Sequence, residues 1–269
     1  MKKFTQLALS LSLICTSASV FAVDKETKET TYQQAYALYL LYHPNIKEQN
    51  TQTVIKQFEQ DYADLFKTNK KVNVEQFIQY EQARLEPLLK QRREMSLKQA
   101  YVRYGILDKN KDQKLTLKEF QETGVKTFDE FDKNKDGIVN AEDSKLSSGT
   151  TGTHDGFKIK LPISMPMPSN VNEFIQQYGK GKSYVTLGDY LTARDQQFFT
   201  TDVSGDHVVT EQEYVNEFMQ RFDKNIETGE VKMKVLAEQQ FNVIAKGKKT
   251  IDANDVRNFA KQVDQAIGQ

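Results

Sequence analysis

Residues 108–119 read DKNKDQKLTLKE, and this stretch indicates how the chain folds. Oxygen-bearing side chains occupy the first, third and fifth places, another follows at the ninth, and a glutamate closes the set at the twelfth. A hard cation such as Ca²⁺ takes about six to eight oxygen ligands, and a tight loop that runs into a helix can supply them. The predicted ligands are Asp108, Asn110, Asp112, Lys114 through its backbone carbonyl, Thr116 and Glu119.

The same spacing occurs twice more, in DKNKDGIVNAED at residues 132–143 and in DVSGDHVVTEQE at residues 202–213. We call the three segments the acidic loops, and their repetition in one chain argues against chance. In the second loop the predicted ligands are Asp132, Asn134, Asp136, Ile138 through its carbonyl, Asn140 and Asp143. In the third they are Asp202, Ser204, Asp206, Val208 through its carbonyl, Thr210 and Glu213.

The acidic loops resemble the calcium-binding loops of the EF-hand family, and most closely the small EF-hand repeats of exported bacterial proteins. The resemblance covers about residues 96–145 and 171–260. It implies helix-loop-helix units with Ca²⁺ as the cofactor, and loops that pair through a short β-bridge at their eighth residues. Those residues are Leu115, Val139 and Val209, which are apolar and suited to such a bridge.

Each acidic loop departs from the strict family pattern at a position that matters. Gln113 and His207 stand at the sixth place, where the backbone takes a positive φ that glycine adopts most easily. Ser204 replaces an acid or amide at the third place. Asp143, shorter than glutamate, closes the second loop, so Mg²⁺ is a second candidate ion for residues 132–143.

Other segments keep part of the pattern. Residues 178–189 and 244–255 carry Val185 and Ile251 at the eighth place but lack early ligands, so we expect them to serve as structural partners. Residues 72–77 are either a further empty unit or part of a helix. Residues 223–234 begin with acids and amides but end at Lys234, and metal binding there is left open.

The N-terminus predicts export. Lys2 and Lys3 precede an apolar run that is too short to span a bilayer, and small residues follow near Ala22, so residues 1–22 are interpreted as a cleaved signal peptide. Its removal leaves 35 basic and 37 acidic residues and takes away Cys15, the only cysteine. We expect a periplasmic or secreted protein with no membrane span in the mature chain and no affinity for nucleic acid.

The predicted fold class is all-α, with tandem EF-hand units and an N-terminal helical segment. We expect an N-terminal helical region at 23–95, an EF-hand pair at 96–145, a linker at 146–170 and a second EF-hand region at 171–269. Pro87 is expected at a helix break or first turn, and Ser96 with Gln99 at a capping box. The apolar part of the linker, 159–167, is either docked on the body or a binding strip.

The function predicted from these patterns is that of a calcium-stabilised scaffold, binding protein or buffer. A calcium sensor that exposes an apolar groove to an unidentified protein partner is the alternative, and a hydrolase with a carboxylate pair is a weaker one. We expect no enzyme, because His43, His154 and His207 lack the spacing of a zinc site and the mature chain has no cysteine nucleophile.

Overall fold

The structure, a computed structural model, describes residues 25–44, 51–147 and 160–267. The predicted signal peptide lies outside the described residues, as do His154 and part of the predicted linker. The described chain is mostly helical, which confirms the all-α class. Its helices are α1 (Lys25–Tyr42), α2 (Thr51–Asp61), α3 (Leu65–Thr68), α4 (Val74–Leu107), α5 (Leu117–Phe131), α6 (Ala141–Leu146), α7 (Val171–Tyr178), α8 (Leu187–Thr201), α9 (Glu211–Ala245) and α10 (Ala253–Ile267).

Four strands of two residues each lie between these helices. They are β1 (Leu115–Thr116), β2 (Ile138–Val139), β3 (Val185–Thr186) and β4 (Val208–Val209). Strand β1 pairs antiparallel with β4, and β2 pairs antiparallel with β3. An isolated antiparallel bridge joins Val72 to Ile251. The three bridges are therefore nested, because each inner pair lies in sequence between the two members of the next pair.

Helix α5 explains why neighbouring acidic loops do not pair with each other. Its 15 residues leave loop 108–119 and lead directly into loop 132–143. At about 1.5 Å per residue, that helix holds the two loops roughly 22 Å apart. The grouping of 96–145 as a pair therefore differs from the structure, in which loop 108–119 pairs with 202–213 and loop 132–143 pairs with 178–189.

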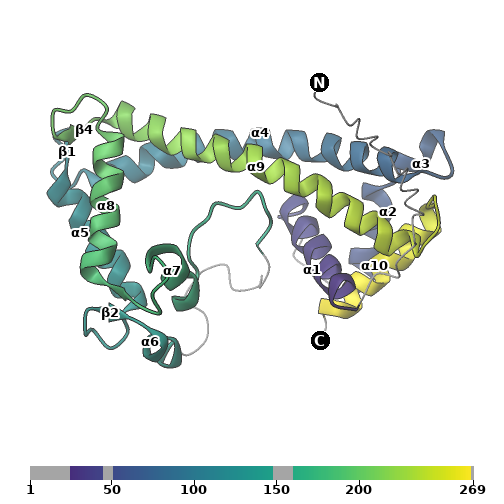
Figure 1. Cartoon of the computed structure of the whole chain (residues 1–269). Helices are drawn as coiled ribbons and strands as arrows, with labels where there is room; N and C mark the ends of the chain where they lie inside the picture. Colours follow the sequence, from purple (N-terminus) through teal and green to yellow (C-terminus); the bar gives the residue numbers. More distant parts are fainter. Residues whose placement is uncertain (1–24, 45–50, 148–159, 268–269) are drawn as a thin grey trace, which may run out of the picture.

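Two long helices, α4 and α9, form the spine of the molecule and pack against each other along their length (Figure 1). At one end of the spine lie α5, α8 and the acidic loops, and at the other lie α1, α2 and α10. The expected break at Pro87 is wrong, since this residue lies inside α4. Leu85 and Leu89, buried on either side of it, hold the helix together by their packing.

The predicted capping box at Ser96 is also wrong, because Ser96 lies inside α4 as well. The helix begins instead at Asn73, whose side chain accepts a hydrogen bond from the N–H of Gln76 while the Gln76 side chain accepts one from the N–H of Asn73. The boundary expected at residues 95/96 falls inside the same helix. Sequence patterns alone cannot show this continuity, because it depends on packing against α9.

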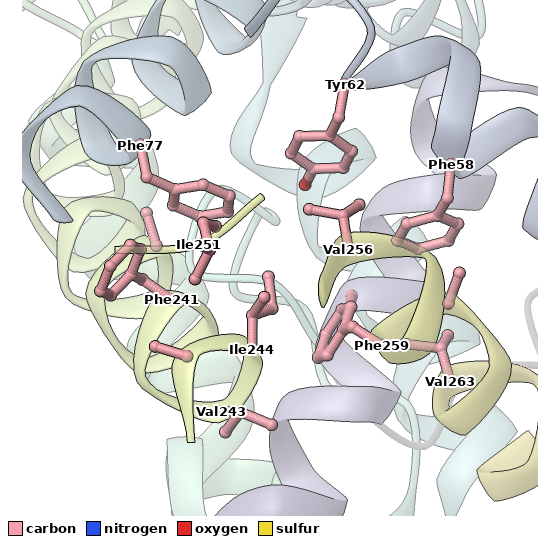
Figure 2. Close-up of a cluster of buried hydrophobic side chains, with 14 of the residues drawn as sticks. Phe58, Tyr62, Phe77, Phe241, Val243, Ile244, Ile251, Val256, Phe259 and Val263 are labelled. Carbon is pink, nitrogen blue, oxygen red and sulfur yellow. The ribbon is translucent and has the colours of Figure 1, made fainter. Parts of the chain in front are cut away.

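The largest apolar core lies at the end that contains α2 and α10. Figure 2 shows Phe58, Tyr62, Phe77, Phe241 and Phe259 converging there from several helices. The eighth residues of the loops lie in the cores as well: Leu115, Val139, Val185 and Ile251 are fully buried and Val209 nearly so. Each β-bridge is thus anchored by apolar burial on one side.

The described part of the predicted linker is docked on the spine. Leu161 and Ile163 are buried in a cluster with residues of α1, α4 and α9. Gly229 of α9 permits this contact, because a Cβ there would lie 2.8 Å from the carbonyl oxygen of Pro162. We call residues 160–168 the strap. A docked loop was one of the two interpretations of this segment.

Residues 223–234, where metal binding was left open, lie within α9 and form no loop. The carboxylate of Asp223 instead accepts hydrogen bonds from Arg93 of α4, at 2.8 and 2.9 Å. None of the described helices combines the length and the apolar character that crossing a membrane requires.

Candidate metal centres

The first residue of each acidic loop is a buried aspartate that organises the turn. Asp108, Asp132 and Asp202 are 4, 2 and 7 % exposed. In each, Oδ2 accepts a hydrogen bond of 2.9 Å from the backbone N–H of the sixth residue. Three loops with different sixth residues therefore share one backbone turn.

The sixth residues have the positive φ that their place in the loop predicts. The φ angle is 63° at Gln113, 84° at Gly137 and 66° at His207. A left-handed conformation costs a residue with a side chain about 1–2 kcal/mol relative to the right-handed one. The hydrogen bond to the buried aspartate offsets that cost, so His207 serves the turn through its backbone.

The second oxygen of the first aspartate distinguishes the loops. Oδ1 of Asp108 and Oδ1 of Asp132 are buried and accept no hydrogen bond. Oδ1 of Asp202, in contrast, accepts hydrogen bonds from Ser204 Oγ at 3.1 Å and from the N–H of Gly205 at 2.8 Å. A buried carboxylate oxygen without a partner is costly, and a hard divalent cation is a fitting partner for it.

The closing carboxylate of each loop caps the helix that follows. Glu119 Oε2 accepts hydrogen bonds from the N–H and the hydroxyl of Thr116, at 3.0 and 2.7 Å. Glu213 has the same two contacts with Thr210, at 2.9 and 2.8 Å. Asp143, fully buried, accepts the N–H of Asn140 at 2.8 Å. The ninth and twelfth residues are thereby fixed at a helix N-terminus, where negative charge is stabilised.

Burial raises the pKa of Glu119, but the hydrogen bonds from Thr116 and from the N–H groups of Asn110 and Lys109 lower it further, and the pKa ends below its usual range. The same balance lowers the pKa of Glu213. Both side chains are therefore anionic at neutral pH, as a ligand for Ca²⁺ must be.

The middle of each loop is a polar turn at the surface. Asn110 and Asp112 bond to each other through side chain and backbone, at 2.9 and 3.0 Å, and Asn134 and Asp136 do the same at 2.9 and 3.1 Å. The carboxylates of Asp112, Asp136 and Asp206 each accept the N–H of the seventh residue two places on. The predicted ligands of each loop therefore lie around one turn.

Within the described ranges, no three acidic or histidine side chains converge closely enough to form a ready-made metal cluster. The closing carboxylates face the loop backbone instead: Glu119 Oε1 accepts the N–H of Lys109 at 3.2 Å, and Asp143 Oδ1 that of Lys133 at 2.8 Å. Across the three loops, the available donors are carboxylate, amide, hydroxyl and backbone oxygens.

A buried polar cluster at the other end of the spine was not predicted from the sequence. Arg84 pairs with Asp61 at 3.0 Å and with Glu81 at 3.2 Å, and its guanidinium stacks over Tyr42 and Tyr62. His43 Nε2 lies 2.8 Å from Asp61. The cavity beside the cluster has a volume of about 10 Å³, which is room for a single water. No local motif marks the cluster, because its members come from separate helices.

Comparison of the chain with protein-family models, with curated proteins and with solved structures gave no match. The side-chain chemistry of the acidic loops is therefore the basis for the proposed function.

Proposed function

We propose that this protein is an exported calcium-binding protein of the EF-hand type, in which two or three bound cations stabilise a scaffold or buffer. The observation that carries the proposal is the pair of buried carboxylate oxygens, Asp108 Oδ1 and Asp132 Oδ1, that accept no hydrogen bond. Each belongs to the first residue of a loop whose other oxygen donors follow at the intervals that Ca²⁺ ligation requires.

The proposed ligands are the eighteen residues predicted from the acidic loops, with side chains or a water at places one, three, five and nine, a carbonyl at seven and the closing acid at twelve. A bound divalent cation would neutralise the three carboxylates in the proposed ligand set of each loop. The contacts of Asp202 with Ser204 and Gly205 make loop 202–213 the weakest of the three sites in this proposal.

The bridges support the EF-hand assignment. Leu115, Val139 and Val209 each pair through their backbone with the eighth residue of a second loop. The resemblance implies such pairing at the eighth place, although here the two members of each pair come from opposite sides of the predicted linker, residues 146–170.

A structural role for the cations is favoured over a sensor. A sensor exposes an apolar groove when it binds Ca²⁺, and methionines commonly line that groove. Here Met219 and Met233 are 7 and 8 % exposed and belong to the apolar clusters of the spine. Fluorescence of a hydrophobic dye should therefore stay level or fall when Ca²⁺ is added. A rise would favour the sensor.

The energetics suit a protein outside the cytoplasm. Extracellular calcium modules have dissociation constants of about 10⁻⁴ to 10⁻³ M. A ligand at ten times its dissociation constant stabilises the folded state by about 1.4 kcal/mol per site. Two or three such sites would contribute appreciably to the stability of a mature chain that has no cysteine and therefore no disulfide. We propose no catalytic role for this chain.

Isothermal titration calorimetry with Ca²⁺ tests the proposal. We expect two or three ions per mature chain, and the loss or marked weakening of one site in each of Glu119→Gln, Asp143→Asn and Glu213→Gln. Glu230→Gln, at an exposed position of α9 outside every loop, is the matched control and should leave the stoichiometry unchanged. Titration with Mg²⁺ should show whether loop 132–143 accepts the smaller ion. Absence of any binding by the wild type would overturn the proposal.

A further inference from the structure

Loops 178–189 and 244–255, here called the partner loops, share a turn that differs from that of the acidic loops. Their left-handed residues are Lys180 with Gly181 and Lys246 with Gly247, at the third and fourth places of both loops. In the acidic loops the left-handed residues stand at the fourth and sixth places. The partner loops are thus two copies of one local structure.

The ends of the partner loops match those of the acidic loops. The closing residues Asp189 and Asp255 accept the N–H of the ninth residue, each at 3.1 Å, as the acids of the acidic loops do. Val185 and Ile251 form the bridges at the eighth place. The partner loops therefore present a closing carboxylate in the same way but carry no acid at the first, third or fifth place.

The fifth residue carries the opposite charge in the two kinds of loop. It is an aspartate in all three acidic loops and a lysine, Lys182 or Lys248, in both partner loops. The ammonium of Lys182 bonds to the carboxylate of Asp189, and that of Lys248 bonds to the carboxylate of Asp255. The side chains of Lys182 and Lys248 are 36 and 56 % exposed and those of Asp189 and Asp255 are 30 and 15 % exposed, so solvent screens both ion pairs.

We propose that Lys182 and Lys248 are internal cations, whose ammonium groups neutralise the closing carboxylates of the partner loops and hold these loops in shape without metal. The same contact in two separate loops, from the same fifth place to the same twelfth place, carries the inference. The inference deepens the proposed function, and one consequence rests on that function. The bridge between 108–119 and 202–213 would have two metal-binding members, and the bridge between 132–143 and 178–189 would have one. The bridge between Val72 and Ile251 would have none.

The ionisation of the pairs agrees with this assignment. The hydrogen bond from Lys182 is the largest cause that lowers the pKa of Asp189, to about 2, and the N–H and hydroxyl of Thr186 lower it further. The hydrogen bond to Asp255 is the main cause that raises the pKa of Lys248. The ammonium of Lys182 therefore stabilises the charged form of Asp189, and the carboxylate of Asp255 stabilises the charged form of Lys248.

Thermal melting of the mature protein in excess chelator tests the inference. Lys182→Met and Lys248→Met remove the ammonium and keep an unbranched side chain. Each should lower the melting temperature by about 2 °C, as expected for a partly exposed ion pair in a chain of this size. Lys180→Met and Lys249→Met are the controls, because both lysines are exposed and lie in or beside the same turns. They should change the melting temperature by less than half as much.

A second measurement separates an internal cation from a general effect of charge. Carbon-detected NMR titration should show a higher pKa for Asp189 in Lys182→Met than in the wild type and in Lys180→Met. Equal melting shifts in the Met variants at 182 and 180, or an unchanged Asp189 pKa, would overturn the inference. Since all measurements are made in chelator, this result is independent of whether the acidic loops bind Ca²⁺.

Discussion

The two ends of the spine stabilise similar loops by different means. At the end that contains α2 and α10, the bridge between Val72 and Ile251 lies on a large core in which Phe58, Phe77 and Phe259 gather. At the other end, the bridges lie on smaller clusters and the loops gather carboxylates. Under the proposed function, the loops on the large core would rely on apolar burial, whereas the loops on the smaller clusters would take the remainder of their stability from a bound cation or, in loop 178–189, from Lys182.

The largest expected effect is at the aromatic end. Phe77 is fully buried and its ring lies 5.8 Å from that of Tyr62 and 5.9 Å from that of Phe241. Phe77→Ala should cost about 3–5 kcal/mol of unfolding free energy, because it leaves a cavity in the core. Denaturant unfolding should give the same loss in Ca²⁺ and in chelator. Phe199→Ala, at a half-exposed aromatic, is the control and should cost far less.

Chelation should have the next largest effect, and it should be local. Removal of three cations, each at ten times its dissociation constant, should cost about 4 kcal/mol. Amide hydrogen exchange should show the lost protection in the acidic loops, α5 and α8, while α2 and α10 keep theirs. An equal loss at both ends would contradict the comparison, and no loss at either end would remove the proposed sites.

A smaller effect is expected where the strap crosses the spine between the two ends. Gly229→Ala would place a methyl group 2.8 Å from the carbonyl oxygen of Pro162 and 3.1 Å from Ile163, so the strap must shift. We expect a loss of about 1–3 kcal/mol, measured by thermal or urea unfolding. Gly105→Ala is the matched control: it is also helical, a Cβ there meets nothing within 4 Å, and the change should be neutral or stabilising.

The smallest effect concerns acid. The pKa of Asp189 in the folded chain, about 2, is below the value of about 4 expected when the chain is unfolded. Its contribution to stability is therefore complete above pH 4 and is lost as the pH falls from about 4 to 2. Urea unfolding between pH 5 and 2 should show a steeper decline for the wild type than for Lys182→Met. Parallel declines would mean that the ion pair contributes nothing.

Local parts of the fold were predictable from the sequence because they depend on neighbouring residues. In loop 108–119, the hydrogen bond from the N–H of Gln113 to Asp108 and the positive φ of Gln113 depend only on residues of that loop. The places of Val185 and Ile251 at bridges followed from the same loop register. The charge reversal at Lys182 was also present in the sequence, and comparing fifth residues across the loops would have shown it.

Long-range features were not predictable in this way. The length of α5 keeps β1 from pairing with β2, and the continuity of α4 through Pro87 depends on its contact with α9. Residues 223–234 have the composition of a loop, yet they remain helical because α9 packs on α4 through that region. Tertiary packing decided each case against the local pattern.

The nested order of the bridges has a consequence for how the chain assembles. Val139 and Val185 are the closest partners in sequence, Leu115 and Val209 enclose them, and Val72 and Ile251 enclose both. Closing the shortest segment first lowers the entropic cost of the next closure. The chain is therefore suited to form its bridges in order from its middle toward its two ends. The proposed cation sites lie in the loops of the two inner bridges, so a bound cation would stabilise the closures that come first in this order.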